Sequence, residues 1–416
     1  MNDLDSKNMQ SKVNELARKK AKLYKKFNSE KHYKLNIIKR RELLGITDEV
    51  STLVGSYFTN QLDKKIMEGK LNPIINTELF REGDPRCIEP MRMLVGAGGT
   101  NAGILDQECC DRRYRKMNGR TFTIRDSLLE KLVQTDIGRN VPLEYLRLPY
   151  DNIYLELGTD RTDRGLYIHD DRTGKHILEG AYLTESSRHY IDMANLSLGN
   201  ELSLYKHLGI KPTDPMRVLY ICFVGSPVGK GGGIDNDTYA SFSIYLPENY
   251  KYSLEYLLKK HIEFYTEKEN FEGAFAPLGK KTETIPEENL VLFGNSFNAI
   301  VASLLFLNSR EPIFEETKEY TEAMAAANRK SPSKRRKYVE SAMVKVNRTF
   351  VGDKSPSTSE GSTENEKRTI SSHWRRGHYR TQRFGESNLK TKLIWIKPTI
   401  VTGGGAPDIK MKDYIV

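Results

Sequence analysis

The chain has 416 residues, of which 38% are hydrophobic and 29% charged, and its formal net charge is +10. This composition excludes a wholly disordered chain, and the length allows two or three folding units. The excess of positive charge favours a polyanionic partner but does not identify it.

Cysteine usage and apolar segments bear on the compartment. The four cysteines, at positions 87, 109, 110 and 222, include no C-x-x-C pair, so we expect reduced thiols. The N-terminus is polar, and the longest apolar run, residues 299–307, is too short to cross a bilayer. We therefore expect a cytoplasmic protein that has no membrane partner.

Residues 1–45 form a basic N-terminal extension. Residues 7–41 contain thirteen lysines and arginines, and Val13, Leu16, Leu23 and Phe27 recur near helical spacing. This pattern predicts a basic amphipathic helix. We favour a solvated helix over a dedicated RNA-binding arm, because basic tracts usually lack specificity.

Residues 46–347 are predicted to form the body of the protein. Helices are expected at 124–133, 254–267, 287–307 and within the charged segment 313–347, which contains a basic block at 329–337. Strands are expected at 152–157, 166–169, 176–183, 218–224 and 239–246. Because four of these strands flank turn-forming segments as two hairpins, we predict an α+β fold with a mixed, largely antiparallel sheet and packed helices.

Two glycine-rich segments, residues 96–103 and 225–235, are predicted to be loops. The first lacks a convincing preceding strand. The second is one residue short of a phosphate-binding loop, and Gly231 stands where a serine or threonine would contact Mg²⁺. The sequence therefore predicts no nucleotide site at either segment.

Residues 348–367 are predicted to be a disordered linker to a C-terminal module, residues 368–416. The linker is rich in Ser, Thr, Gly and Glu and has too few apolar residues to bury. Beyond it, residues 373–384 and 392–397 flank a short turn-forming segment. This arrangement predicts a C-terminal β-hairpin.

The segment 373–385 concentrates residues suited to RNA. It contains two histidines, four arginines and three aromatic residues. Arginine makes bidentate contacts with phosphate, and aromatic rings stack on unpaired bases. With the strand that follows, we predict an RNA-binding surface made of Trp374, Arg375, Arg376, Tyr379, Arg380, Gln382, Arg383, Trp395 and Lys397.

His373 and His378 are the candidate catalytic residues. They would face opposite sides of an unbroken strand, but a bulge at Gly377 would place both on one face with Arg375 and Arg380. That face would supply a general base, a general acid and cations for RNA cleavage without a metal. The alternative, which we favour, is phosphate binding or a structural role. Two histidines with no nearby cysteine are too few for zinc, so no metal or other cofactor is predicted.

The C-terminal segment has the pattern His-Trp-x-Arg-Gly-His-aromatic-Arg-x-Gln-x-x-Gly at 373–385, then Ile-Trp-Ile-x-Pro at 394–398. This pattern resembles that of a known family of phage and plasmid proteins that includes a type V-A anti-CRISPR protein. Residues 148–156 and 302–309 are similar to the family's Leu-Pro-aromatic strand and to its helix that ends in Leu-Asn-Ser. The resemblance covers roughly residues 120–402.

This resemblance implies regulation of a messenger RNA in a prokaryotic host cell. The anti-CRISPR member of the family recognises the emerging N-terminus of the Cas effector during translation and causes loss of the encoding message. By this resemblance, residues 120–347 would recognise a nascent polypeptide, and residues 373–385 would act on messenger RNA or the ribosome. The implied function is an anti-CRISPR-like regulator from a mobile element that lowers expression of a specific host protein.

Two other functions stay open at this point. One is a metal-independent ribonuclease centred on His373 and His378, which predicts cleavage that resists EDTA and leaves 2′,3′-cyclic phosphate ends. The other is a non-enzymatic nucleic-acid-binding structural protein, which predicts salt-sensitive binding with no preference for RNA over DNA.

Overall fold

A computed structural model describes sixteen stretches or single positions of the chain. They are residues 15, 18, 35–46, 110–138, 141–160, 164–170, 174–188, 199–211, 214–227, 237–266, 292–309, 314–343, 345–352, 373–375, 377–397 and 399–401. The first glycine-rich segment, most of the second and most of the predicted linker lie outside these residues.

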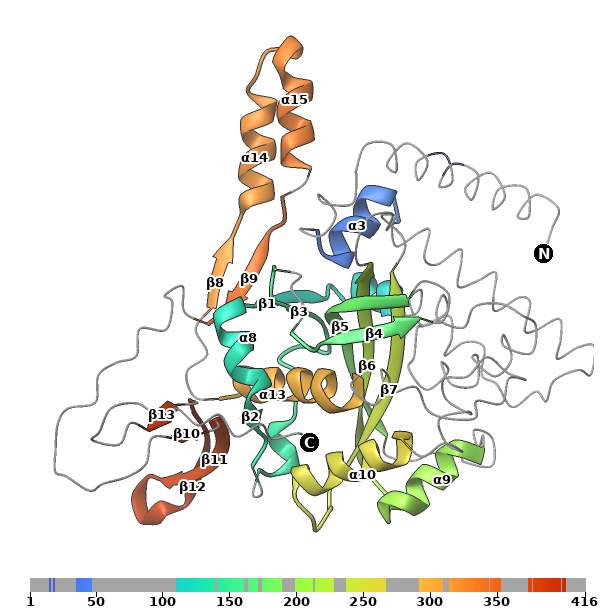
Figure 1. The fold of residues 1–416 in the computed structure, drawn as a ribbon, viewed down its shortest axis with the longest axis vertical. Helices are drawn as coiled ribbons and strands as arrows, with labels where there is room; N and C mark the ends of the chain where they lie inside the picture. Colours follow the sequence, from blue (N-terminus) through green and yellow to red (C-terminus); the bar gives the residue numbers. More distant parts are fainter. Residues whose placement is uncertain are drawn as a thin grey trace, which may run out of the picture.

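An eight-stranded sheet forms the centre of the molecule (Figure 1). Its strands are β1 (Arg120–Ile124), β3 (Asn152–Leu157), β4 (Tyr167–Asp170), β5 (Gly174–Arg188), β6 (Met216–Pro227), β7 (Thr238–Pro247), β8 (Phe314–Thr317) and β9 (Arg348–Val351). The order is β7-β6-β5-β3-β1-β9-β8, with β4 paired to β5 off this path. β1 is parallel to β3 and β9, and the other pairs in this sheet are antiparallel. The predicted α+β class with a mixed, largely antiparallel sheet is confirmed.

The two predicted body hairpins are also confirmed. β4 and β5 are antiparallel, with Asp170 opposite Gly174 and Tyr167 opposite Ile177. β6 and β7 pair along ten positions, from Met216 opposite Pro247 to Gly225 opposite Thr238. Residues 225–227, the described start of the second glycine-rich segment, therefore belong to β6 and do not form the predicted loop.

Four helices cover the sheet, namely α8 (Asp126–Val133), α9 (Gly199–Leu208), α10 (Leu254–Thr266) and α13 (Phe297–Leu307). α8 buries Leu128, Leu129 and Leu132, as its spacing predicted. α13 buries nearly every side chain, because it lies between the sheet and the C-terminal hairpin, next to α8 (Figure 1). Residues 287–291 of the predicted helix lie outside the described residues, and Leu292–Ser296 forms a π-helical turn before α13.

A helical arm projects from the edge of the sheet. It consists of α14 (Glu319–Asn328) and α15 (Pro332–Ala342), which pack against each other and connect β8 to β9 (Figure 1). Two expectations are corrected here. The segment predicted as helical begins with β8, and the first four residues of the predicted linker form β9, because the backbone of β1 offers them a pairing edge.

The end of the N-terminal extension is part of the body. α3 (Ile37–Leu44) buries Lys39, Arg40 and Arg41 together with two apolar residues. The expectation of a solvated helix is therefore wrong for this stretch, because its arginines pair with buried carboxylates, Arg40 with Glu179 of β5 and Arg41 with Asp111. The rest of the predicted N-terminal helix lies outside the described residues except for positions 15 and 18.

The C-terminal residues form two small sheets. β11 (Gly377–Phe384) and β12 (Lys390–Ile396) make the predicted hairpin, and β2 (Thr135–Asp136) adds a third strand parallel to β11. β10 (His373–Arg375) and β13 (Thr399–Val401) pair separately. In the described ranges, no helix has both the length and the apolar character needed to cross a membrane.

Candidate functional site

The β11–β12 hairpin is fixed to the body by two aromatic side chains on its inner face. Tyr379 is 2% exposed, and its hydroxyl donates a 2.6 Å hydrogen bond to the carbonyl oxygen of Ala302 in α13. Burial raises the pKa of Tyr379 well above its usual value. Trp395 donates from Nε1 to Thr135 Oγ1 at 3.2 Å, and its ring meets Phe306 edge-on at 5.2 Å between centroids. These contacts fix the position of the hairpin against α13 and β2.

A glycine allows the close approach of the hairpin. Gly138 has φ +86, and a Cβ at this position would lie 2.3 Å from the carbonyl oxygen of Tyr379. Any side chain would displace the hairpin and would also strain the backbone.

The outer face of the hairpin is cationic and partly aromatic. We use this name for His378, Arg380, Gln382 and Phe384 of β11 with Ile396, Ile394, Lys392 and Lys390 opposite them on β12. Arg380, Gln382, Phe384 and Lys390 are exposed. Lys392 Nζ lies 5.3 Å from the ring centroid of Phe384. Such a face can contact phosphates through its cations and a base through its one exposed ring.

The predicted RNA-binding residues divide into three groups. Arg380, Gln382, Arg383 and Lys397 are exposed and free to contact a ligand. Tyr379 and Trp395 anchor the hairpin; the ring of Tyr379 has no exposed face on which a base could stack. The side chains of Trp374, Arg375 and Arg376 lie outside the described part of the structure.

Phe384, Lys390 and Lys392 belong to the surface but were absent from the predicted set. The available signal was alternation: pairing β11 with β12 places every second residue of both strands on one side. The exact register, with Gln382 opposite Lys392, could not be read from the sequence.

The two candidate catalytic histidines lie in different sheets. His373 begins β10, whereas His378 lies in β11, next to Asp136 of β2 in register. The prediction of a bulge at Gly377 is wrong. Arg375 lies opposite Thr399 and His378 opposite Ile396, so two residues on each strand separate these pairs and no extra residue is left for a bulge. The side chain of His373 is not among those described. Within the described residues, no group of three His, Cys, Asp or Glu side chains is placed to hold a metal ion.

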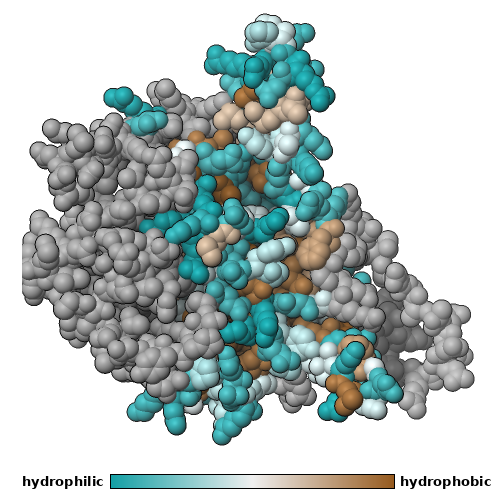
Figure 2. Space-filling model, turned by 180° about the vertical axis from the view of Figure 1, so that it is seen from behind, coloured by the Kyte–Doolittle hydropathy of each residue, from teal (hydrophilic) through white to brown (hydrophobic). Residues whose placement is uncertain are grey.

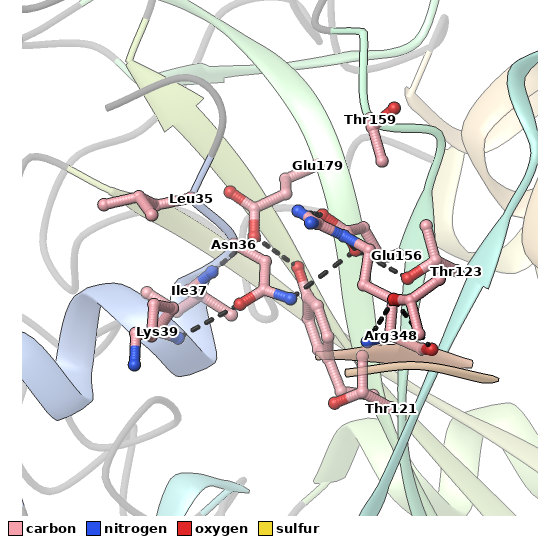
Figure 3. Close-up of polar contacts among 12 residues, drawn as sticks. Leu35, Asn36, Ile37, Lys39, Thr121, Thr123, Glu156, Thr159, Glu179 and Arg348 are labelled. Atoms are coloured by element: carbon pink, nitrogen blue, oxygen red, sulfur yellow. Dashed lines mark hydrogen bonds and ion pairs between the residues drawn. The ribbon is translucent and has the colours of Figure 1, made fainter. Parts of the chain in front are cut away.

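A second polar cluster lies under α3, around Glu179 of β5 (Figure 3). Glu179 is fully buried and accepts hydrogen bonds from the amide of Ile37 at 2.5 Å, from Arg40 Nη2 at 2.6 Å and from the Tyr154 hydroxyl at 2.6 Å. Ser226 donates to the same carboxylate. Burial alone would lower the pKa of Arg40, but Asp237 and Glu179 raise it above its usual value.

Glu156 of β3 is the other fully buried carboxylate of this cluster. Arg348 of β9 donates to it from Nε at 2.9 Å and from Nη2 at 3.2 Å, and Thr123 donates at 2.7 Å (Figure 3). Asn36 reaches it at 3.5 Å while its own Oδ1 accepts from the amide of Lys39 at 3.0 Å and caps α3. The cluster therefore connects α3, β1, β3, β5 and β9.

This buried cluster holds the fold together rather than offering an open site. Each carboxylate already accepts several hydrogen bonds, which leaves little capacity for a ligand. This cluster was not predicted, although the sequence contains a signal for it. Glu156 and Glu179 interrupt apolar strand segments, and a charge in a strand that is buried on both faces needs a partner.

Comparison with known proteins places the chain in a family. The model of the AcrVA2-like family, the anti-CRISPR type V subtype A2 family, matches residues 122–403. A solved structure described as the crystal structure of AcrVA2 is 12% identical, with 84% of this chain and 94% of that chain covered and a TM-score of 0.39. No curated protein matches. Because the family match covers well over half of the chain, this protein belongs to the anti-CRISPR type V subtype A2 family.

Proposed function

We propose that the protein lowers production of a type V-A Cas effector by acting on the effector's messenger RNA while it is translated. The body recognises the nascent N-terminus of the effector, and the outer face of the hairpin contacts RNA of the message or the ribosome. Family membership supports the CRISPR target. The anchored hairpin with its exposed cations is the observation that carries the RNA contact.

The chemistry of the hairpin supports this role in two ways. Its inner face is packed against α13, so the outer face keeps its geometry without a ligand and loses little entropy on binding. The outer face combines Arg380 and Lys392 with the exposed ring of Phe384. This combination of cations and an aromatic ring suits single-stranded RNA, whose bases are free to stack.

The first experiment measures the effector and its message in cells. The protein is co-expressed with a type V-A effector, and effector protein and messenger RNA are quantified. We expect both to fall with the wild-type chain and to recover with R380Q/K390Q/K392Q, which removes three cations of the outer face. The control K206Q/K211Q/K251Q removes the same charge from lysines that are exposed and remote from the hairpin, and it should repress like wild type.

The second experiment separates recognition of a peptide from recognition of an RNA sequence. Synonymous recoding of the first codons of the effector should leave repression intact, because the nascent peptide is unchanged. A compensated frameshift over the same codons keeps most of the RNA sequence but changes the peptide, and it should abolish repression. If effector protein and message stay constant while CRISPR interference is still blocked, the protein acts on the assembled effector and the proposal fails.

A further inference from the structure

The helical arm carries a dense group of cations at its free end. Residues 329–337 contain six lysines and arginines and no Asp or Glu, namely Arg329, Lys330, Lys334, Arg335, Arg336 and Lys337. All six are exposed. Figure 2 shows the projecting arm covered mainly by hydrophilic residues. We call this group the arm-tip cations.

The arm is built to hold this group away from the body. Ala327 of α14 and Ala342 of α15 are buried, which lets the two helices pack closely. Asn347 Oδ1 accepts from the amides of Tyr320 and Thr321 at 3.1 and 3.2 Å and caps the start of α14. With a rise of about 1.5 Å per residue, α14 alone moves the tip about 15 Å from the sheet edge.

Among the described residues, few contacts neutralise the arm-tip cations. Arg336 Nε lies 3.3 Å from Glu340, but its side chain is 90% exposed, so this pair contributes little. Arg335 donates to the amide oxygen of Asn328 at 2.7 Å, which fixes it without neutralising its charge. Lys330 lies 4.8 Å from the ring centroid of Tyr338. A positive potential therefore remains at the tip and is available to an anionic partner.

We propose that the arm tip binds the phosphate backbone of a double-helical RNA. This site goes beyond the proposed hairpin contact, and only the choice of RNA over DNA rests on the proposed function. The arm tip and the hairpin lie far apart (Figure 1), so both can engage one large folded RNA at the same time.

The residues at the tip favour a duplex over two other anionic partners. Binding in a membrane surface requires a broad apolar face, and Tyr338 is the one large hydrophobic side chain of the arm that is strongly exposed, at 43%. Single-stranded RNA is held by several stacked rings, and the arm has Tyr338 as its one strongly exposed ring beside six cations. Closely spaced cations with so little aromatic surface match the regular phosphates of a double helix.

The test compares two full-length variants that lose the same charge. The arm variant is K334Q/R335Q/R336Q/K337Q, and the control is K206Q/K211Q/K251Q/K259Q, whose lysines are exposed on and around α9 and α10. Binding to a 20-base-pair RNA duplex is measured by fluorescence anisotropy across a range of salt concentrations. We expect the arm variant to lose at least about tenfold in affinity, with a slope of log K against log salt that is shallower by about 3. The control should stay within about threefold of wild type.

Additional binding measurements identify the ligand of the arm tip. DNA of the same sequence should bind more weakly than the RNA duplex to the wild-type chain, and anionic phosphatidylserine vesicles should not distinguish the arm variant from the control. Equal losses in both variants would mean that net charge alone is measured, which overturns the proposal. An effect of the arm variant on vesicles or on single-stranded RNA, but not on the duplex, also overturns it. Because the hairpin is intact in the arm variant, these outcomes are independent of the messenger RNA experiments above.

Discussion

His261 of α10 is fully buried and is fixed by two backbone hydrogen bonds. Nε2 accepts from the amide of Tyr245 at 3.0 Å, and Nδ1 lies 2.9 Å from the carbonyl oxygen of Leu257, which requires a proton on Nδ1. The neutral imidazole satisfies both bonds, whereas the charged form would lose the first. Burial lowers the pKa of His261 to about 4.

This histidine should make the protein less stable in mild acid. The unfolded chain takes up a proton near pH 6.5 and the folded chain only near 4, so the stabilisation is complete above about pH 6.5 and is lost as pH falls toward 4. Between pH 7.5 and 5, the wild-type chain should lose about 2 kcal/mol more unfolding free energy than H261Q, measured by urea denaturation. Parallel pH dependences for the two proteins would contradict this assignment.

Among the residues under α3, substitution of Glu179 should lower the free energy of unfolding most. The substitution E179Q keeps the shape of the side chain but leaves Arg40 with one carboxylate partner, Asp237, at 2.7 Å. Removing one member of a buried ion pair costs about 3 kcal/mol or more, and we expect a loss of that size in urea denaturation. E42Q is the matched control, because Glu42 pairs with Lys39 but is 51% exposed, and it should change stability by no more than about 0.5 kcal/mol.

At the scale of elements, Tyr379 should decide whether the hairpin stays docked. Y379A removes a buried aromatic ring and should cost about 3–5 kcal/mol locally. Y379F removes only the hydrogen bond to Ala302 and should cost about 1 kcal/mol. Hydrogen exchange should accelerate in β11 and β12 of Y379A but not in β5 or β6. F384A, which removes an exposed ring of the same strand, should leave the exchange unchanged; faster exchange there would show that Tyr379 is not the anchor.

Elements with strong local patterns could be predicted from the sequence, and those defined by distant partners could not. The strand 152–157 and the leucine face of α8 were expected where they lie, because alternating or periodic apolar residues determine them. β9 has no such pattern, and it is a strand because β1 and β8 pair with it. The short strand β13 likewise has no strong pattern of its own, and it is a strand because β10 pairs with it.

At the scale of the whole molecule, the hairpin surface could also be predicted only in part from the sequence. The composition of residues 373–385 identified a basic aromatic surface, and Arg380, Gln382 and Arg383 are indeed exposed on the hairpin. Composition could not tell which ring faces α13, since Tyr379 and Phe384 differ only in which side of β11 they occupy. The arginines of α3 were misinterpreted for a related reason: their partners, Glu179 and Asp111, are distant in sequence.

The topology of the sheet also makes the helical arm separable from the body. β8 and β9 are antiparallel neighbours, and Thr317 lies directly opposite Arg348. Replacing residues 318–347 with Asn-Gly should therefore close a two-residue hairpin and keep Arg348 paired with Glu156. The arm touches α3 through Lys39, whose Nζ lies 3.3 Å from the ring centroid of Tyr320, and loss of this contact should lower Tm by less than about 4 °C.

This excision gives the sharpest division between the two proposed surfaces. The shortened chain should lose affinity for duplex RNA to the same extent as the arm variant, because the same cations are removed. It should still crosslink to single-stranded RNA through Arg380 and Lys392, since the hairpin is anchored on α13 and β2, which the excision leaves intact. Fluorescence anisotropy measures the affinity for duplex RNA, crosslinking measures the contact of the hairpin with RNA, and calorimetry measures Tm. A large fall in Tm would mean that the arm stabilises the sheet, whereas loss of the hairpin crosslinks with an unchanged Tm would mean that both surfaces form one binding site.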